Sequence, residues 1–96
     1  MSKHVRDNER YSILIEPLDF CCMCGAYRTD LHEVFSGPNR QASKDYGLVI
    51  PLCRRCHELI HKNSAVRRKW QEWAQRAFEK LYGHDKFMEV FRKNYL

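Results

Sequence analysis

The feature that most constrains this chain is a pair of short cysteine motifs. Cys21 and Cys24 form one CxxC pair, Cys53 and Cys56 form another, and 28 residues separate the two pairs. At this spacing a tight turn can direct two thiolates toward one metal ion, and two such pairs supply the four sulfur ligands of a structural zinc site. The sequence therefore predicts a zinc ion that joins two distant parts of the chain. Cys22 is the fifth cysteine, and we interpret it as a buried small residue because Cys22-x-Cys24 leaves too little chain for such a turn.

The length of the chain makes such a staple useful. A length of 96 residues predicts a single domain. A domain of this size buries only about 60–70% of the surface that its unfolded form exposes. Charged residues occur throughout the first twenty positions, and no apolar run is long enough for a signal peptide or a membrane span. We therefore expect a cytoplasmic protein with no membrane partner, whose cysteines stay reduced and bind metal. The competing interpretation is that they are buried thiols without a metal.

The charge pattern and the composition divide the chain into three parts. We expect an N-terminal arm (1–19), a metal module (20–62) and a helical tail (63–96). The chain has a net charge of +5, and the tail alone contains eight basic and four acidic residues. This excess suits a polyanionic partner such as DNA, although similar charge also serves solubility.

The arm and the tail carry simple structural patterns. In the arm, residues 11–15 are apolar and predict a short strand that Pro17 ends. In the tail, apolar residues recur at helical steps and predict an amphipathic helix that Gly83 stops, followed by a second helix from about Asp85. The stripe on the first helix consists of Trp70, Trp73, Ala74, Ala77, Phe78 and Leu81. We interpret it as core, with a dimer face or a partner groove as the alternative.

The metal module predicts two strands and a helix. Residues 31–35 and 46–50 have strand composition, residues 36–39 have turn composition, and a helix follows the second cysteine pair. His57 and His61 would share one face of that helix, and a shared zinc would bring His32 on the first strand toward them. Three histidines can chelate one cation, although a histidine pair at this spacing also fits an ordinary surface helix. His4 and His84 receive no role.

These residues resemble a known family, the HNH or ββα-metal endonucleases, and in particular its small zinc-knuckle members from phages and prophages. The resemblance covers roughly residues 21–61. The matching segments are Cys21-x-x-Cys24, His32-Glu33, and Leu52-Cys53-Arg54-Arg55-Cys56-His57. The resemblance implies an α+β fold with a treble-clef-like HNH module, stapled by the four-cysteine zinc and followed by C-terminal helices.

The resemblance also implies a site and a reaction. A second, catalytic divalent metal (Mg, Mn, Ni or Zn) would be held by His32, His57 and His61, and the enzyme would hydrolyse DNA phosphodiester bonds with low sequence specificity. His32, Glu33 and His57 would be the catalytic residues. The chain departs from the family because Glu33 stands where a histidine base is usual. In the literal register, His32 binds the metal and Glu33 is the base or orients water, whereas in a register shifted by one His32 is the base and Asp30 must reach in as a ligand.

Basic residues around the module are candidates for contacts with DNA phosphates. They are Arg40, Lys44, Arg54, Arg55, Arg67 and Arg68. Arg40 and Lys44 also fit the simpler interpretation of solvated loop charges. The main rival function is a non-catalytic treble-clef zinc module that binds DNA or protein and needs a single metal. The family further suggests a homodimer, or partners in phage packaging or recombination.

Overall fold

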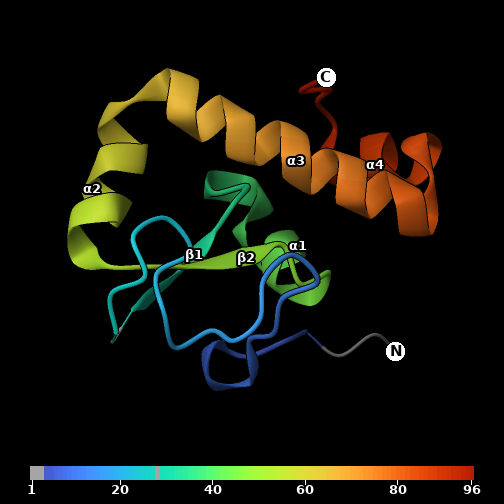
Figure 1. Cartoon of the computed structure of the whole chain (residues 1–96). Coiled ribbons are helices and arrows are strands. Elements are labelled where there is room, and N and C mark those ends of the chain that lie inside the picture. The colour runs from blue at the N-terminus through green and yellow to red at the C-terminus, as the bar shows by residue number, and fades with distance from the viewer. Residues whose placement is uncertain (1–3, 28) are drawn as a thin grey trace.

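The computed structural model describes residues 4–27 and 29–96, and its centre is a two-stranded antiparallel sheet (Figure 1). Strand β1 (Asp30–Glu33) pairs with β2 (Val49–Leu52) so that Asp30 lies opposite Leu52 and His32 lies opposite Ile50. With helices packed around this sheet, the chain has the predicted α+β class. The second strand begins three residues later than predicted, and Pro51 lies inside it. A proline is tolerated there because each strand of a two-stranded sheet has a free edge.

The connection between the strands is more structured than the turn that the sequence predicts. It contains a 3-10 turn, η2 (Gly37–Asn39), and a short helix, α1 (Arg40–Asp45). The hydroxyl of Ser43, which is fully buried, donates to the carbonyl of Phe35 at 2.6 Å and accepts from the N–H of Phe35 at 3.1 Å. This two-way contact fixes α1 against the end of β1. Gly47, with a φ of +70°, then reverses the chain, which explains the late start of β2.

The predicted strand at residues 11–15 is wrong, because the arm runs past the sheet without pairing to it. Over residues 4–19 its regular structure is limited to a 3-10 turn, η1 (Asp7–Glu9). Side chains hold the arm in place: the hydroxyl of Ser12 donates to the carbonyl of Val49 at 2.6 Å, and the hydroxyl of Tyr11 donates to the carbonyl of Asp45 at 2.6 Å. The apolar run therefore packs as irregular chain, held by these hydroxyl groups and by one backbone hydrogen bond, from the N–H of Ile13 to the carbonyl of Gly47 at 2.9 Å.

Three helices follow the sheet. Helix α2 (Arg54–Lys62) leads into α3 (Ser64–Tyr82), and α4 (His84–Phe91) folds back beside the end of α3 (Figure 1). Both tail helices were predicted, and Gly83, with a φ of +88°, separates them. Aromatic side chains from the sheet region and the tail form the core, namely Phe35, Phe78, Phe87 and Phe91. The predicted stripe is core only in part: Ala74 and Phe78 are fully buried, while Trp73 is 39% and Leu81 is 61% exposed.

No helix among the described residues is both long enough and apolar enough to cross a membrane.

Candidate metal centres

The four cysteines of the two CxxC pairs come together in the structure. One sulfur from each of Cys21, Cys24, Cys53 and Cys56 lies within 4.8 Å of the others, and all four thiols are free. The sulfurs of Cys24 and Cys53, from opposite pairs, are 3.5 Å apart. Four convergent thiols are the ligand set of a closed, tetrahedral zinc site. The group could therefore hold a structural zinc, as the sequence predicts.

Each cysteine pair is presented by a local turn. In the first turn, the N–H of Gly25 donates to the carbonyl of Cys21 at 2.8 Å, and Gly25 adopts a φ of +80° that favours glycine. The second pair opens helix α2: Cys53 is the N-cap residue, and its sulfur accepts from the N–H of Cys56 at 3.4 Å. The N–H of Cys22 donates to the carbonyl of Pro51 at 2.9 Å, which fastens the first turn to β2.

The thiols differ in their electrostatics. Burial raises the pKa of Cys22 to about 11, with the neighbouring Cys21 adding to the effect, so Cys22 stays a protonated thiol at neutral pH. Cys21 is the opposite case, because hydrogen bonds from backbone N–H groups outweigh its burial and lower its pKa to about 6. Burial and the adjacent sulfurs raise the pKa of Cys56. Crowded thiols cannot all ionise by themselves, and a divalent cation among them removes this conflict.

A second cluster lies beside the first and consists of three histidines. One ring nitrogen from each of His32, His57 and His61 lies within 4.8 Å of the others, and Nδ1 of His32 is 3.1 Å from Nε2 of His57. His32 projects from β1 and is 6% exposed, whereas His57 and His61 project from α2 toward more open surroundings. Burial and the two other imidazoles lower the pKa of His32 to about 4, so its ring is neutral at pH 7 and has a lone pair for a cation.

Helix α2 connects the two clusters. Cys53 and Cys56 lie at its start, His57 follows Cys56 directly, and His61 lies one turn further along the same face. Strand β1 supplies the third imidazole by pairing with β2, which runs into Cys53. The same backbone therefore fixes the positions of both ligand sets.

Asp30 lies next to the histidine cluster but outside it. Residues 30 and 32 share a strand face because side chains alternate along a strand, and Oδ2 of Asp30 is 3.8 Å from Nδ1 of His57. This distance is too long for a hydrogen bond. The ligand atoms that converge are those of His32, His57 and His61, and Asp30 lies on the Nδ1 side of the His57 ring.

Glu33 is directed away from the histidines. Its side chain is 10% exposed, its Oε1 is 3.0 Å from Nη1 of Arg10, and the same oxygen is 3.6 Å from Nε of Arg40. Arg10 also donates to the carbonyl of Leu31 at 3.1 Å. Glu33 belongs to neither metal cluster in the described part of the chain. Sequence reasoning missed Arg10, and no local pattern indicates that an arginine in the arm meets a strand 23 residues away.

Two of the side chains predicted to contact phosphate are instead bonded to groups of the protein itself, Lys44 to a carboxylate and Arg67 to backbone carbonyls. The ammonium of Lys44 is nearly buried and donates to Oδ1 of Asp7 at 2.8 Å, a hydrogen bond that lowers the pKa of Asp7. Nη1 of Arg67 donates to the carbonyls of Ile60 and His61 at 3.1 and 3.0 Å, so Arg67 holds the last turn of α2. Lys44 therefore fastens the arm instead of facing solvent.

The other predicted contacts remain at the surface. Arg54 and Arg55 are exposed on the first turn of α2. Arg40 is half exposed beside Glu33 and Asp7, and Arg68 is 45% exposed, with Nε 3.5 Å from Oε2 of Glu72. These side chains come from three different helices, α1, α2 and α3.

No protein-family model, curated protein or solved structure matches this chain. What the two clusters can do is therefore argued from their ligands and surroundings.

Proposed function

We propose that this protein is a metal-dependent endonuclease of the HNH type that hydrolyses DNA phosphodiester bonds. The observation that carries the proposal is the histidine cluster beside the four-cysteine group. One cluster would be structural and the other catalytic. The order of the ligands along the chain is also the order that the resemblance to the HNH family implies.

The two ligand sets support this division. Four cysteines fill every position of a tetrahedral ion, as in structural zinc sites, whereas three protein ligands leave a position open, as in catalytic sites. His57 is partly exposed and His61 is exposed, so substrate can approach from their side. The imidazoles are uncharged ligands when bound to a cation, so they leave its positive charge available to a phosphate.

The proposed reaction is in-line hydrolysis. A water oxygen bonds to phosphorus as the bond from phosphorus to the 3′-oxygen breaks, the water loses a proton and the 3′-oxygen gains one. The products are 5′-phosphate and 3′-hydroxyl ends. A divalent ion held by the three histidines would supply Lewis-acid stabilisation of the charge that develops on the phosphate. The chain's own contribution is to orient these histidines, His32 through its strand and the other two through α2.

The test is cleavage of supercoiled plasmid by the zinc-loaded protein with added magnesium, manganese or nickel, and with a chelator as the blank. His57→Ala and His61→Ala should abolish metal-dependent nicking, and His84→Ala should not. His84 is a fair control because it is an exposed histidine that pairs with Glu79 at 2.7 Å, outside both clusters. Metal analysis should find one tightly bound zinc in every variant. Equal activity in the control and cluster variants, or none in the parent protein with any metal, would refute the proposal.

The second candidate is a non-catalytic zinc module that binds DNA or protein. The observation that favours it is Glu33, which occupies the family's base position yet is held by Arg10. The discriminating measurement is metal stoichiometry under native conditions. The endonuclease takes up a second, exchangeable divalent ion that His61→Ala removes, whereas the module binds a single zinc that this variant retains.

A further inference from the structure

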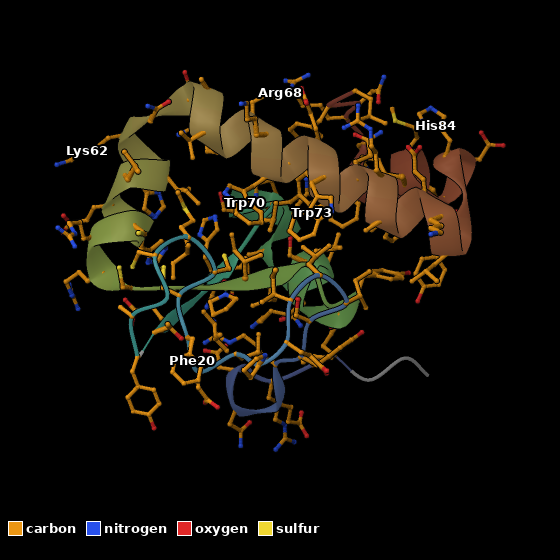
Figure 2. All side chains as sticks on the ribbon, viewed as in Figure 1. Phe20, Lys62, Arg68, Trp70, Trp73 and His84 are labelled. Carbon is orange, nitrogen blue, oxygen red and sulfur yellow. The ribbon has the colours of Figure 1, made fainter. Side chains whose placement is uncertain are left out.

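A basic hollow lies on the outer side of the tail, where the start of α3 meets the C-terminal segment. It encloses about 470 Å³ and is lined by Arg67, Arg68, Gln71, Lys93 and Tyr95, together with the small residues at the start of α3. None of the residues that line it is acidic. Figure 2 shows Arg68 projecting from the side of α3 opposite to Trp70 and Trp73, so the hollow and the tryptophans occupy different faces of this helix.

Tyr95 lines the hollow and contacts two of its basic side chains. Tyr95 is 9% exposed and two cations lie over its ring: Cζ of Arg68 is 5.4 Å and Nζ of Lys93 is 5.1 Å from its centroid. The N–H of Tyr95 donates to Oε1 of Gln75, which is fully buried, at 2.8 Å. The C-terminal segment is therefore anchored, and it brings Lys93 to the same place as Arg68.

The cations of the hollow keep free donors. The carboxylate nearest to Arg68 is that of Glu72, which contacts Nε and leaves the two terminal nitrogens of the guanidinium. Lys93 is exposed and forms no ion pair with any residue that the structure describes. Arg68 and Lys93 thus offer free donors to one hollow with a single carboxylate at its edge, an arrangement suited to an anion, while Arg67 in the wall is bonded to α2.

Arg67 connects the wall of the hollow to the last turn of α2. Nη1 of this residue donates to the carbonyl of His61, so one wall of the hollow is bonded to the turn of α2 that carries a proposed metal ligand. A strand of DNA in the proposed site would extend beyond the cleaved bond, and its next phosphates need cations within reach.

We propose that this hollow binds a backbone phosphate that flanks the cleaved bond of DNA. The inference rests on the proposed function and assigns to Lys93 and Arg68 a part in holding the substrate. DNA fits better than a single phosphorylated side chain because the basic excess continues along the tail, with eight basic and four acidic residues in 63–96. Such contacts position the duplex and carry no base preference.

The test compares Lys93→Gln with Lys86→Gln in the zinc-loaded full-length protein. Both remove one charge from the same region, but Lys86 is on α4, 3.7 Å from Glu89 and outside the hollow. Binding to a labelled duplex is followed by fluorescence anisotropy over a range of salt concentrations, with no other divalent ion added. Lys93→Gln should weaken binding several-fold and reduce the slope of log affinity against log salt by about 1, the effect of losing one phosphate contact, and Lys86→Gln should leave the slope unchanged.

Three outcomes would overturn the inference: equal losses in the two variants, no loss in Lys93→Gln, or unchanged DNA binding with lost binding to vesicles of anionic lipid. Thermal unfolding checks that each variant remains folded. The plasmid assay separates this inference from the proposed function. A protein that cleaves DNA but keeps its salt slope in Lys93→Gln refutes only the hollow, whereas a protein that shows the slope change without cleaving refutes only the endonuclease.

Discussion

Replacing Glu33 by glutamine distinguishes two roles for this carboxylate. The resemblance to HNH enzymes makes Glu33 a general base or a water-orienting group, whereas its contacts make it a clamp that holds the arm to β1 through Arg10. Glutamine has nearly the same shape but no charge. We expect Glu33→Gln to destabilise the fold and to leave the cleavage rate of the folded protein within about threefold of the parent rate.

The size of the loss follows from the contact. A hydrogen bond to a charged group contributes about 1.5–3 kcal/mol, and removing one partner of a buried ion pair costs about 3–5 kcal/mol. The side chains of Arg10 and Glu33 are 17% and 10% exposed, and glutamine can still accept one hydrogen bond, so the lower range applies. We expect about 2 kcal/mol, which in a domain of this size lowers Tm by roughly 8–16 °C.

The assay measures Tm by circular dichroism and kcat on plasmid at a temperature where every variant is folded. Arg10→Gln is the matched variant, because it breaks the same contact and leaves the carboxylate in place. As a clamp, Glu33 should give both variants a similar loss of stability, and the double variant should lose less than the sum of the two. A fall in kcat of about 10²–10⁴ in Glu33→Gln alone, with Tm unchanged, would refute the clamp and identify a general base.

Three further predictions test the metal site and the hairpin. Cys24→Ser should weaken zinc binding more than about tenfold while Cys22→Ser keeps it, as titration with a chromogenic chelator would show, and equal retention would contradict the ligand assignment. Ser43→Ala should cost about 2 kcal/mol in urea unfolding, because a buried N–H loses its acceptor, and a loss below about 0.5 kcal/mol would count against this account. Gly47→Ala should destabilise by more than about 1 kcal/mol, since its φ is +70° and the new Cβ would lie 2.5 Å from the Tyr11 ring; an unchanged Tm would show that the turn relaxes.

The parts of the fold that the sequence predicted are those with a strong local signal. The helices of the tail follow from apolar residues at helical spacing and from Gly83, and the cysteine group follows from two turns of fixed spacing. The histidine cluster could also be predicted from the sequence, because a zinc ion shared by the two cysteine pairs restricts where β1 can lie relative to α2. These signals need only short stretches of chain.

The parts that sequence reasoning missed depend on contacts between distant residues. Residues 11–15 were predicted as a strand. Instead, the hydroxyl groups of Tyr11 and Ser12 donate hydrogen bonds to backbone carbonyls in α1 and β2. The contact between Glu33 and Arg10 was missed because a basic partner 23 residues earlier is invisible to a local motif, and the catalytic role of Glu33 stays a prediction. Lys44 looked like a free loop cation because nothing in its neighbourhood reveals Asp7.

The position of α2 makes the geometry of the histidine cluster depend on the cysteine group. This helix has nine residues, and an isolated helix shorter than about 12–15 residues is marginal in water. Its first turn is fixed by Cys53 and Cys56, and its last turn is held by Arg67. His57 and His61 lie between these anchors, so their geometry persists only while both remain. A zinc ion in the cysteine group would therefore hold the start of α2, and with it His57 and His61, in position, and removal of that zinc should disturb the histidine cluster.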